Sequence, residues 1–303
     1  MGRIWIGLVL LAAITSMPEM VTGVSSVALV ASPDLALGTL FGSCCFNLSI
    51  LALLDILHSR TPVLTEASPR HMASAGWGIL LIAIAAGGIV AGGKFPSLAL
   101  GWVGIPSIII LLVYLVAMRQ MFHLERSHQT PVQDASLQYD QMPARTAYFR
   151  FALAAAAVIA AGIWLSFIGD DIAETTGWAA SFVGSLFLAI TTSAPELVVT
   201  ISALRLAAID MAVADVLGAN MLDIAIILPV DLFYAKGPVL SSVSSSHLVT
   251  AAVVVIMNLL VIAGLRLHRE HKTFRVISWY APILIGLFVV TAYALFSLGT
   301  GTR

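Results

Sequence analysis

Two short segments of the sequence combine hydroxyl groups, a proline and a glutamate inside long apolar runs. They read Thr15-Ser16-Met17-Pro18-Glu19 and Thr192-Ser193-Ala194-Pro195-Glu196. Proline has no backbone N–H and clashes with the carbonyl group four residues earlier, so each segment should open its helix and free carbonyl oxygens. Carbonyl, hydroxyl and carboxylate oxygens are hard ligands; Ca²⁺ takes about six to eight of them, and Na⁺ accepts the same donor type. The two segments therefore predict a cation site whose ligands include Thr15, Ser16, Glu19, Thr192, Ser193 and Glu196.

A second polar block follows each of these segments. It reads Gly42-Ser43-Cys44-Cys45-Phe46-Asn47 in the first half of the chain and Gly218-Ala219-Asn220-Met221-Leu222-Asp223 in the second. The glycines should let two helices approach closely, and Ser43 adds a hydroxyl group. Asn47 and Asp223 lie four to five residues further on, and helical periodicity turns them toward the same cavity. We expect Ser43, Asn47 and Asp223 to complete the site.

The elements that must position these residues are membrane-spanning helices. Apolar residues make up 59% of the chain and charged residues 10%, whereas a soluble domain carries roughly 25% charged residues. A helix needs about 20 mainly apolar residues to cross a bilayer. Nine such segments can be marked, at residues 4–31, 36–57, 74–93, 98–118, 148–169, 178–207, 211–234, 248–267 and 278–299. The sequence predicts an all-α, multi-pass membrane protein whose partners are the lipid bilayer and cations, and no nucleic acid.

The two polar blocks recur in the same order in both halves of the chain. Glu19 and Glu196 lie five spans apart. This is an odd number, so the two repeats should cross the membrane in opposite directions, as in transporters whose site lies near the midplane between inverted repeats. One such motif could be only a kinked helix. Two such motifs at matching positions indicate a functional role, because a carboxylate at the membrane centre costs about 2.5–3.5 kcal/mol.

A polar stretch divides the nine spans into four and five. We expect residues 1–118 to form the first membrane half, 119–147 a cytoplasmic linker and 148–303 the second membrane half. If the first span starts inside, twelve of the 15 lysine and arginine residues lie inside, and the other three are Lys94, Lys236 and Arg303. An excess of lysine and arginine is typical of the cytoplasmic side of a membrane protein, and this distribution agrees with nine spans.

Other acidic positions each have a second interpretation. Asp34 and Asp210 open their helices and are expected to be N-caps. Asp55 and Asp231 lie two turns beyond the second polar block; they could line access paths, but we favour pairing with nearby serine, threonine or backbone groups. The acidic loop at 170–174 could concentrate cations or could simply be solvated.

The two blocks resemble the alpha repeats of the calcium/cation antiporter superfamily, in particular its sodium/calcium exchanger branch. That family has Gly-Thr-Ser-x-Pro-Glu in one helix and Gly-Ser-Asn-x-x-Asn or -Asp at the start of the next. The resemblance implies a ten-helix fold and exchange of Ca²⁺ for Na⁺ by alternating access, with both ions as transported substrates, no cofactor and no enzymatic activity. It also implies the plasma (inner) membrane. Carried over by position, the central acids are Glu19 and Glu196, the midplane polar pair is Asn47 and Asp223, and the other ligands are Thr15, Ser16, Thr192, Ser193 and Ser43.

The sequence departs from the family pattern at several positions. Ala219 stands where a serine hydroxyl is frequent, Cys44 replaces an asparagine, and Ile14 and Thr191 replace the leading glycines. None of these changes removes a central carboxylate. The first half begins directly on its motif helix, without the leading helix of the family; we favour a true start upstream over a transporter that works without this helix.

Three rival functions remain open. The closest is exchange of Ca²⁺ or another divalent cation for H⁺ on the same scaffold. An intramembrane enzyme such as a protease would need a paired nucleophile and base within the membrane, and no histidine or lysine falls at midplane depth in the expected spans. A non-transporting paralogue is the third, suggested by the short first half.

Overall fold

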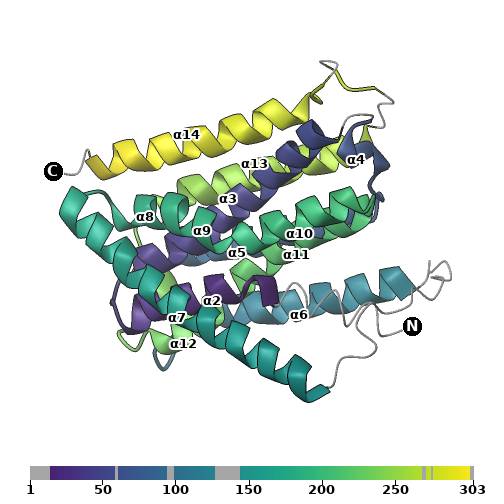
Figure 1. Cartoon of the computed structure of the whole chain (residues 1–303). Helices are drawn as coiled ribbons and strands as arrows, with labels where there is room; N and C mark the ends of the chain where they lie inside the picture. Colours follow the sequence, from purple (N-terminus) through teal and green to yellow (C-terminus); the bar gives the residue numbers. More distant parts are fainter. Residues whose placement is uncertain are drawn as a thin grey trace.

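The computed structural model describes residues 14–58, 61–93, 99–126, 144–267, 271–273 and 276–300, which form an almost entirely helical bundle (Figure 1). Seven helical spans of the described residues are long and apolar enough to cross a membrane, and the number rises to eight if Ala180–Thr192 and Ala194–Arg205, bent by 44° at their junction, count as one broken span. The all-α membrane architecture expected from the sequence is confirmed. The first expected span, 4–31, lies partly outside the described residues.

The described part of the first half contains two short helices, three long ones and a small hairpin. Its elements are α2 (Met17–Ala28), α3 (Pro33–Leu57), α4 (Val63–Glu66), α5 (His71–Gly92), β1 (Ala99–Leu100), β2 (Val103–Gly104) and α6 (Ile105–Arg126). The helices α2 and α3 both carry a proline in their first two positions, where the missing N–H removes no helical hydrogen bond. The two strands pair antiparallel, with Ala99 opposite Gly104.

The second half contains a complete broken span followed by the counterparts of the first-half helices. Its elements are α7 (Ala144–Thr176), α8 (Ala180–Val183), the π-helical turn η1 (Gly184–Leu188), α9 (Ala189–Thr192), α10 (Ala194–Arg205), α11 (Ile209–Ala225), α12 (Ile227–Phe233), the 3₁₀ turn η2 (Val239–Ser241), α13 (His247–Arg266) and α14 (Tyr280–Thr300). The 44° bend separates α9 from α10.

Two polar stretches that the sequence analysis placed outside helices are helical. α6 begins at Ile105 and continues to Arg126, so it includes the start of the expected linker 119–147; the Trp77 indole N–H donates to Gln120 at 2.6 Å and ties this extension to α5. α7 begins at Ala144 and runs to Thr176, so the acidic stretch 170–174 lies in its last turns and not in a loop. Extending an existing helix gains one backbone hydrogen bond for each residue that is fixed. Polar side chains that point to the surface do not oppose this extension, so the helices continue into the polar stretches.

The helices α3 and α11 form the centre of the bundle. The most apolar stretch is 72% buried both in α3 and in the span Ile209–Phe233, which joins α11 to α12, compared with 11% in α7 and 22% in α14. A helix that is apolar all round and exposed in this way faces lipid, whereas one that is buried must pack against protein on all sides. The polar groups of α3 and α11 are therefore held inside the protein.

The first turns of α3 and α11 are each tied to the start of another helix. In both cases an aspartate accepts a hydrogen bond from a serine N–H and also contacts the histidine that begins the following helix. The contacts are Ser244 N to Asp34 Oδ1 at 2.7 Å, His247 Nε2 to Asp34 Oδ1 at 2.9 Å, Ser68 N to Asp210 Oδ1 at 2.6 Å and His71 Nε2 to Asp210 Oδ1 at 3.0 Å.

These ties show that α3 and α11 run antiparallel, as inverted repeats require. The start of α11 lies beside the start of α5, which follows the end of α3, and the start of α3 lies beside the start of α13, which follows α12. The prediction that Asp34 and Asp210 are N-caps is wrong. The N-cap residues are Ser32 and Ala208, without side-chain capping bonds, because the two carboxylates turn to the donors of the neighbouring segment.

Replacing Asp34 by asparagine should destabilise the protein more than the same change at Asp210. The side chains of His247 and Asp34 are 0% and 32% exposed, whereas those of His71 and Asp210 are 10% and 59% exposed. A hydrogen bond to a charged group contributes about 1.5–3 kcal/mol when shielded from water, and an exposed ion pair about 0–1 kcal/mol. Thermal unfolding of the purified variants measures the difference; equal or reversed shifts would contradict this ranking.

The helix α3 lies directly against η1. A Cβ atom added at Gly42 would lie 2.4 Å from the backbone oxygen of Ser185, so the close approach expected at Gly42 is confirmed. At Gly218 no atom within the described residues lies within 4 Å of the same position. The repeat counterpart of Ser185 is residue 8, which lies outside those residues.

The variant Gly42→Ala should lower the melting temperature, because the added methyl group meets a backbone atom that cannot rotate away. Overpacking of this kind costs about 1–3 kcal/mol. Gly76→Ala is the matched control, since a Cβ there meets nothing within 4 Å and alanine favours a helix over glycine by about 0.5–1 kcal/mol. A Gly42→Ala protein that melts at or above the wild-type temperature would show that α3 and η1 can separate freely.

Candidate cation-binding site

Two helix breaks place two glutamates deep in the bundle. The helix α2 starts after Ser16 and α10 after Ser193, and both serines have φ −84° with ψ of 8° and 10°. Each break falls two residues before the proline of its segment. Glu19 and Glu196 lie in the first turns that follow, where the peptide N–H groups have no acceptor within the helix and the helix dipole favours negative charge.

Each serine at a break donates to the glutamate of the other repeat. Ser193 Oγ donates to Glu19 Oε1 at 2.9 Å, and Ser16 Oγ donates to Glu196 Oε1 at 3.4 Å. In the sequence each serine lies three residues from the glutamate of its own segment, but the structure pairs them across segments 180 and 174 residues apart. The two helix breaks therefore face each other.

The remaining expected hydroxyl groups lie in the same region. Ser43 Oγ lies 3.5 Å from Thr192 Oγ1, and both hydroxyl groups face Glu19. The Thr15 hydroxyl faces Glu196. Hydroxyl oxygens from both repeats thus surround the two carboxylates.

The polar pair on the central helices completes this region. Asn47 on α3 donates from Nδ2 to Asp223 Oδ2 on α11 at 3.4 Å. Glu19 and Glu196 interact electrostatically with each other and with Asp223. The structure thus brings the nine expected site residues together.

The whole region is shielded from solvent. The three acids are 0% exposed, and the most exposed of the nine side chains, Thr15, is 5% exposed. Among the described residues no three histidine, cysteine, aspartate or glutamate side chains converge into a compact metal centre. A cation held here would therefore need hydroxyl, amide and carbonyl oxygens in addition to the carboxylates.

Four acceptor oxygens in this region are buried and receive no hydrogen bond. They are Glu19 Oε2, Glu196 Oε2, Asp223 Oδ1 and Asn47 Oδ1. A buried acceptor without a donor costs about 1–3 kcal/mol, and a charged one costs more. One free oxygen on each acid and one on the amide is an arrangement that a cation would satisfy.

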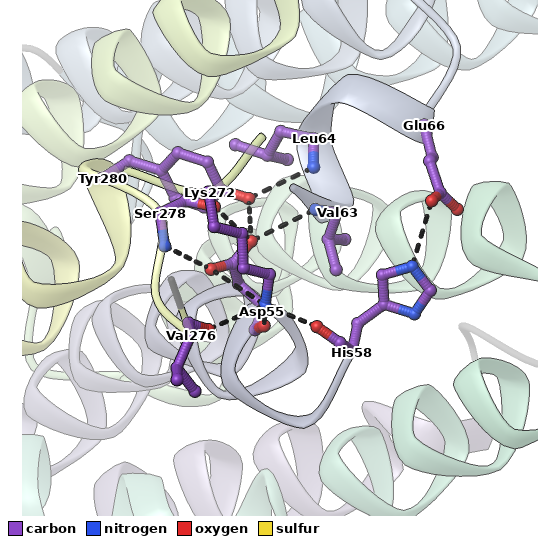
Figure 2. A network of polar contacts seen from close by, with 9 residues as sticks. All are labelled: Asp55, His58, Val63, Leu64, Glu66, Lys272, Val276, Ser278 and Tyr280. Atoms are coloured by element: carbon purple, nitrogen blue, oxygen red, sulfur yellow. Dashed lines mark hydrogen bonds and ion pairs between the residues drawn. The ribbon is translucent and has the colours of Figure 1, made fainter. Parts of the chain in front are cut away.

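Asp55 belongs to a separate network, shown in Figure 2. Its Oδ1 accepts hydrogen bonds from the Tyr280 hydroxyl at 2.6 Å and the Ser278 hydroxyl at 2.7 Å, and its Oδ2 accepts the Ser278 N–H at 2.8 Å. Lys272 Nζ lies 3.8 Å from Oδ2 and also donates to the backbone oxygens of Asp55, His58 and Val276. The network joins the end of α3 to the start of α14.

Asp231, the repeat counterpart of Asp55, is bound in a similar way, and among the described residues no lysine contacts it. Its Oδ1 accepts the Val239 N–H at 2.6 Å, and its Oδ2 accepts the Gly104 N–H at 2.8 Å and the Ser107 hydroxyl at 2.5 Å. The interpretation favoured from the sequence, pairing with nearby serine and backbone groups, is confirmed for both aspartates.

Two buried polar residues outside the nine expected ligands lie close to the site; Asp215 was expected only near the inner membrane interface. Asn220 donates to the Cys44 oxygen at 3.3 Å and leaves its own Oδ1 without a donor; it stands at the asparagine of the family pattern. Asp215 is buried, and its Oδ2 also has no donor. Its position on α11, eight residues before Asp223, was the available signal, because that spacing returns to the same helix face.

Comparisons with known proteins agree with this geometry. The family model described as "Sodium/calcium exchanger protein" matches residues 1–120 and 146–299. No curated protein matches the chain in a sequence search.

Solved structures of the sodium-calcium exchanger NCX_Mj share the fold. The structure soaked with 100 mM Na⁺ and 10 mM Sr²⁺ is 19% identical, with 95% of this chain and 86% of that chain covered and a TM-score of 0.59. The structure soaked with 2.5 mM Na⁺ and 0.1 mM Ca²⁺ is 19% identical over 95% and 85% of the two chains, with a TM-score of 0.58. The structure soaked with zero Na⁺ and Ca²⁺ is 19% identical over 95% of this chain and 86% of that chain, with a TM-score of 0.58.

Proposed function

The chain belongs to the sodium/calcium exchanger protein family, and we propose that it exchanges Ca²⁺ for Na⁺ across a membrane as a secondary antiporter. The observation that carries this proposal is the set of four buried, unpartnered oxygens on Glu19, Glu196, Asp223 and Asn47. The proposed ligands are these four residues together with Thr15, Ser16, Thr192, Ser193 and Ser43. The bound ions are transported substrates.

Charge balance gives a physical reason for antiport. Three ionised carboxylates in one enclosed region are too costly to leave without counter-charge. One Ca²⁺ neutralises two of these charges, and several Na⁺ ions do the same. The empty site therefore resists the transition between the two membrane faces, and each type of ion leaves in exchange for the other.

The helix α7 is well placed to couple movement to this site. It is the least buried of the described membrane-spanning helices, and it packs against α2 through Gly162, whose backbone oxygen accepts the Thr22 hydroxyl at 3.3 Å. A Cβ at Gly162 would lie 2.9 Å from Val21. We propose that a shift of α7 along α2 opens and closes access to Glu19, one turn away.

The placement in the membrane follows the positive charge. We propose that the starts of α5 and α11 lie on the cytoplasmic side, with the linker 119–147, and that the protein occupies the plasma (inner) membrane. We propose that residues 1–118 and 148–303 make the two membrane halves, with α6 and α7 extending from them into the linker. Members of the family are transporters, so we propose no catalytic role, and the presence of all three acids argues against a non-transporting paralogue.

Exchange against H⁺ is the second candidate, because protons can also neutralise the unpartnered carboxylate oxygens. The two candidates separate in proteoliposomes that hold the purified protein, with radioactive Ca²⁺ uptake measured under an imposed Na⁺ gradient and then under an imposed pH gradient. Uptake driven by the Na⁺ gradient alone supports the proposal. Uptake driven only by the pH gradient replaces Na⁺ by H⁺, and no uptake under either gradient contradicts Ca²⁺ transport.

A further inference from the structure

A fourth buried acid lies on the face of α11 that carries Asp223. Asp215 is 6% exposed, and its Oδ2 atom is buried and receives no hydrogen bond. It precedes Asp223 by eight residues, which places it about 12 Å along the helix axis toward the start of α11. Asp210 ties that start to Ser68 and His71. Asp215 therefore lies between the central region and one face of the membrane.

Glu196 lies on α10, the helix that precedes α11. The helices α10 and α11 pack against each other as consecutive helices, and the charge of Asp215 acts on Glu196. Glu196 Oε2 is likewise buried without a donor. Two carboxylates on adjoining helices thus each present an unsatisfied oxygen, and no ion pair with a lysine or arginine is found for either in the described part of the chain.

The other repeat has no such acid. The counterpart of Asp215, 176 residues earlier on α3, is Thr39, which is neutral and donates its hydroxyl to the Leu35 oxygen at 2.9 Å. One turn further along, Ser43 corresponds to Ala219. The approach to the site from the start of α3 therefore has hydroxyl groups, and the approach from the start of α11 has a carboxylate.

We propose that Asp215 and Glu196 form a cation-binding position between the central site and the membrane face at which α11 begins. The position takes the same hard cations, Ca²⁺ or Na⁺, through the free Asp215 Oδ2 and Glu196 Oε2 atoms. This inference rests on the proposed exchange function and makes the two access routes to the site different. A cation that arrives from the Asp215 face meets a buried carboxylate before it reaches Asp223, whereas a cation that arrives from the Thr39 face does not.

The test is the variant Asp215→Asn, with Ca²⁺ uptake measured in membrane vesicles of both orientations over a range of Ca²⁺ concentrations. Half-saturating Ca²⁺ should rise about tenfold where the Asp215 face meets the added Ca²⁺, since one charge near a divalent ion contributes on that order. The half-saturating Ca²⁺ concentration should stay unchanged in vesicles whose Thr39 face meets the added Ca²⁺. Asp215→Glu keeps the charge and should restore uptake toward the wild-type curve, which an effect of packing alone would not do.

A folded Asp215→Asn protein with the wild-type curve on both faces, or with equal changes on both, overturns the inference and leaves the exchange function standing. Loss of exchange in the wild-type protein would instead remove the exchange function. If Asp215→Asn does not purify as a single species, Thr39→Asp is measured in its place. The added acid should lower half-saturating Ca²⁺ at the Thr39 face, and an unchanged value there contradicts the inference.

Discussion

Replacing Glu19 or Glu196 by glutamine is expected to abolish Na⁺-driven Ca²⁺ flux, with a loss of at least about a hundredfold. Each glutamate accepts a serine hydroxyl on Oε1 and leaves Oε2 buried without a donor. Glutamine can keep the first contact through its own Oε1. At the position of Oε2 it puts an NH₂ group, whose hydrogens point into the space where a cation would bind.

The expected size follows from the charge that is lost. Removing one partner of a buried ionic interaction costs about 3–5 kcal/mol, and each 1.4 kcal/mol corresponds to a tenfold change in affinity. The serine contacts survive, so the variants should still fold. Radioactive Ca²⁺ uptake into proteoliposomes under a Na⁺ gradient measures the loss directly.

Glu66→Gln is the matched control, because this glutamate lies at the surface on α4, and its side chain contacts His58 and not the cation site. Its flux should equal that of the wild type. Undiminished flux in a folded Glu19→Gln or Glu196→Gln protein would remove these carboxylates from the transport site, whatever the family of the chain.

Replacing Lys272 by methionine should cause the largest loss of stability among single changes outside the site. The Lys272 side chain is 1% exposed and Asp55 is 0% exposed, and the ammonium group is the only lysine or arginine contact found for this carboxylate in the described part of the chain. Methionine fills a similar volume but leaves Asp55 as a buried charge without a cation. It also leaves three backbone oxygens without their donor (Figure 2).

Breaking a buried ion pair in this way costs about 3–5 kcal/mol, which should lower the melting temperature by roughly 10 °C. Lys236→Met is the control, since Lys236 is exposed and its replacement should change the melting temperature little. The double variant Lys272→Met with Asp55→Asn should recover part of the loss, because it removes the uncompensated charge. A Lys272→Met protein that melts like the wild type would show that the network contributes no stability.

The sequence by itself determined the chemistry of this protein and its symmetry. Proline and glutamate recur in two apolar segments, and the second polar blocks follow at nearly the same offset. The sequence alone therefore predicts that Glu19 corresponds to Glu196 and Asn47 to Asp223 in the two repeats. The apolar runs gave most of the helices, because twenty apolar residues have few alternatives in a bilayer. The limits of α6 and α7 were wrong, since polar residues at the surface do not end a helix.

Only the tertiary structure decided which groups meet. Ser193 donates to Glu19 and not to the glutamate of its own segment, Asp34 turns to His247 and not to its own helix, and Lys272 reaches Asp55 from 217 residues away. Helical periodicity places a side chain on a face, but its partner depends on the depth at which two helices cross. The same dependence lets the charge of Asp215 act on Glu196 and leaves Thr39, its counterpart in the first repeat, bonded to its own helix.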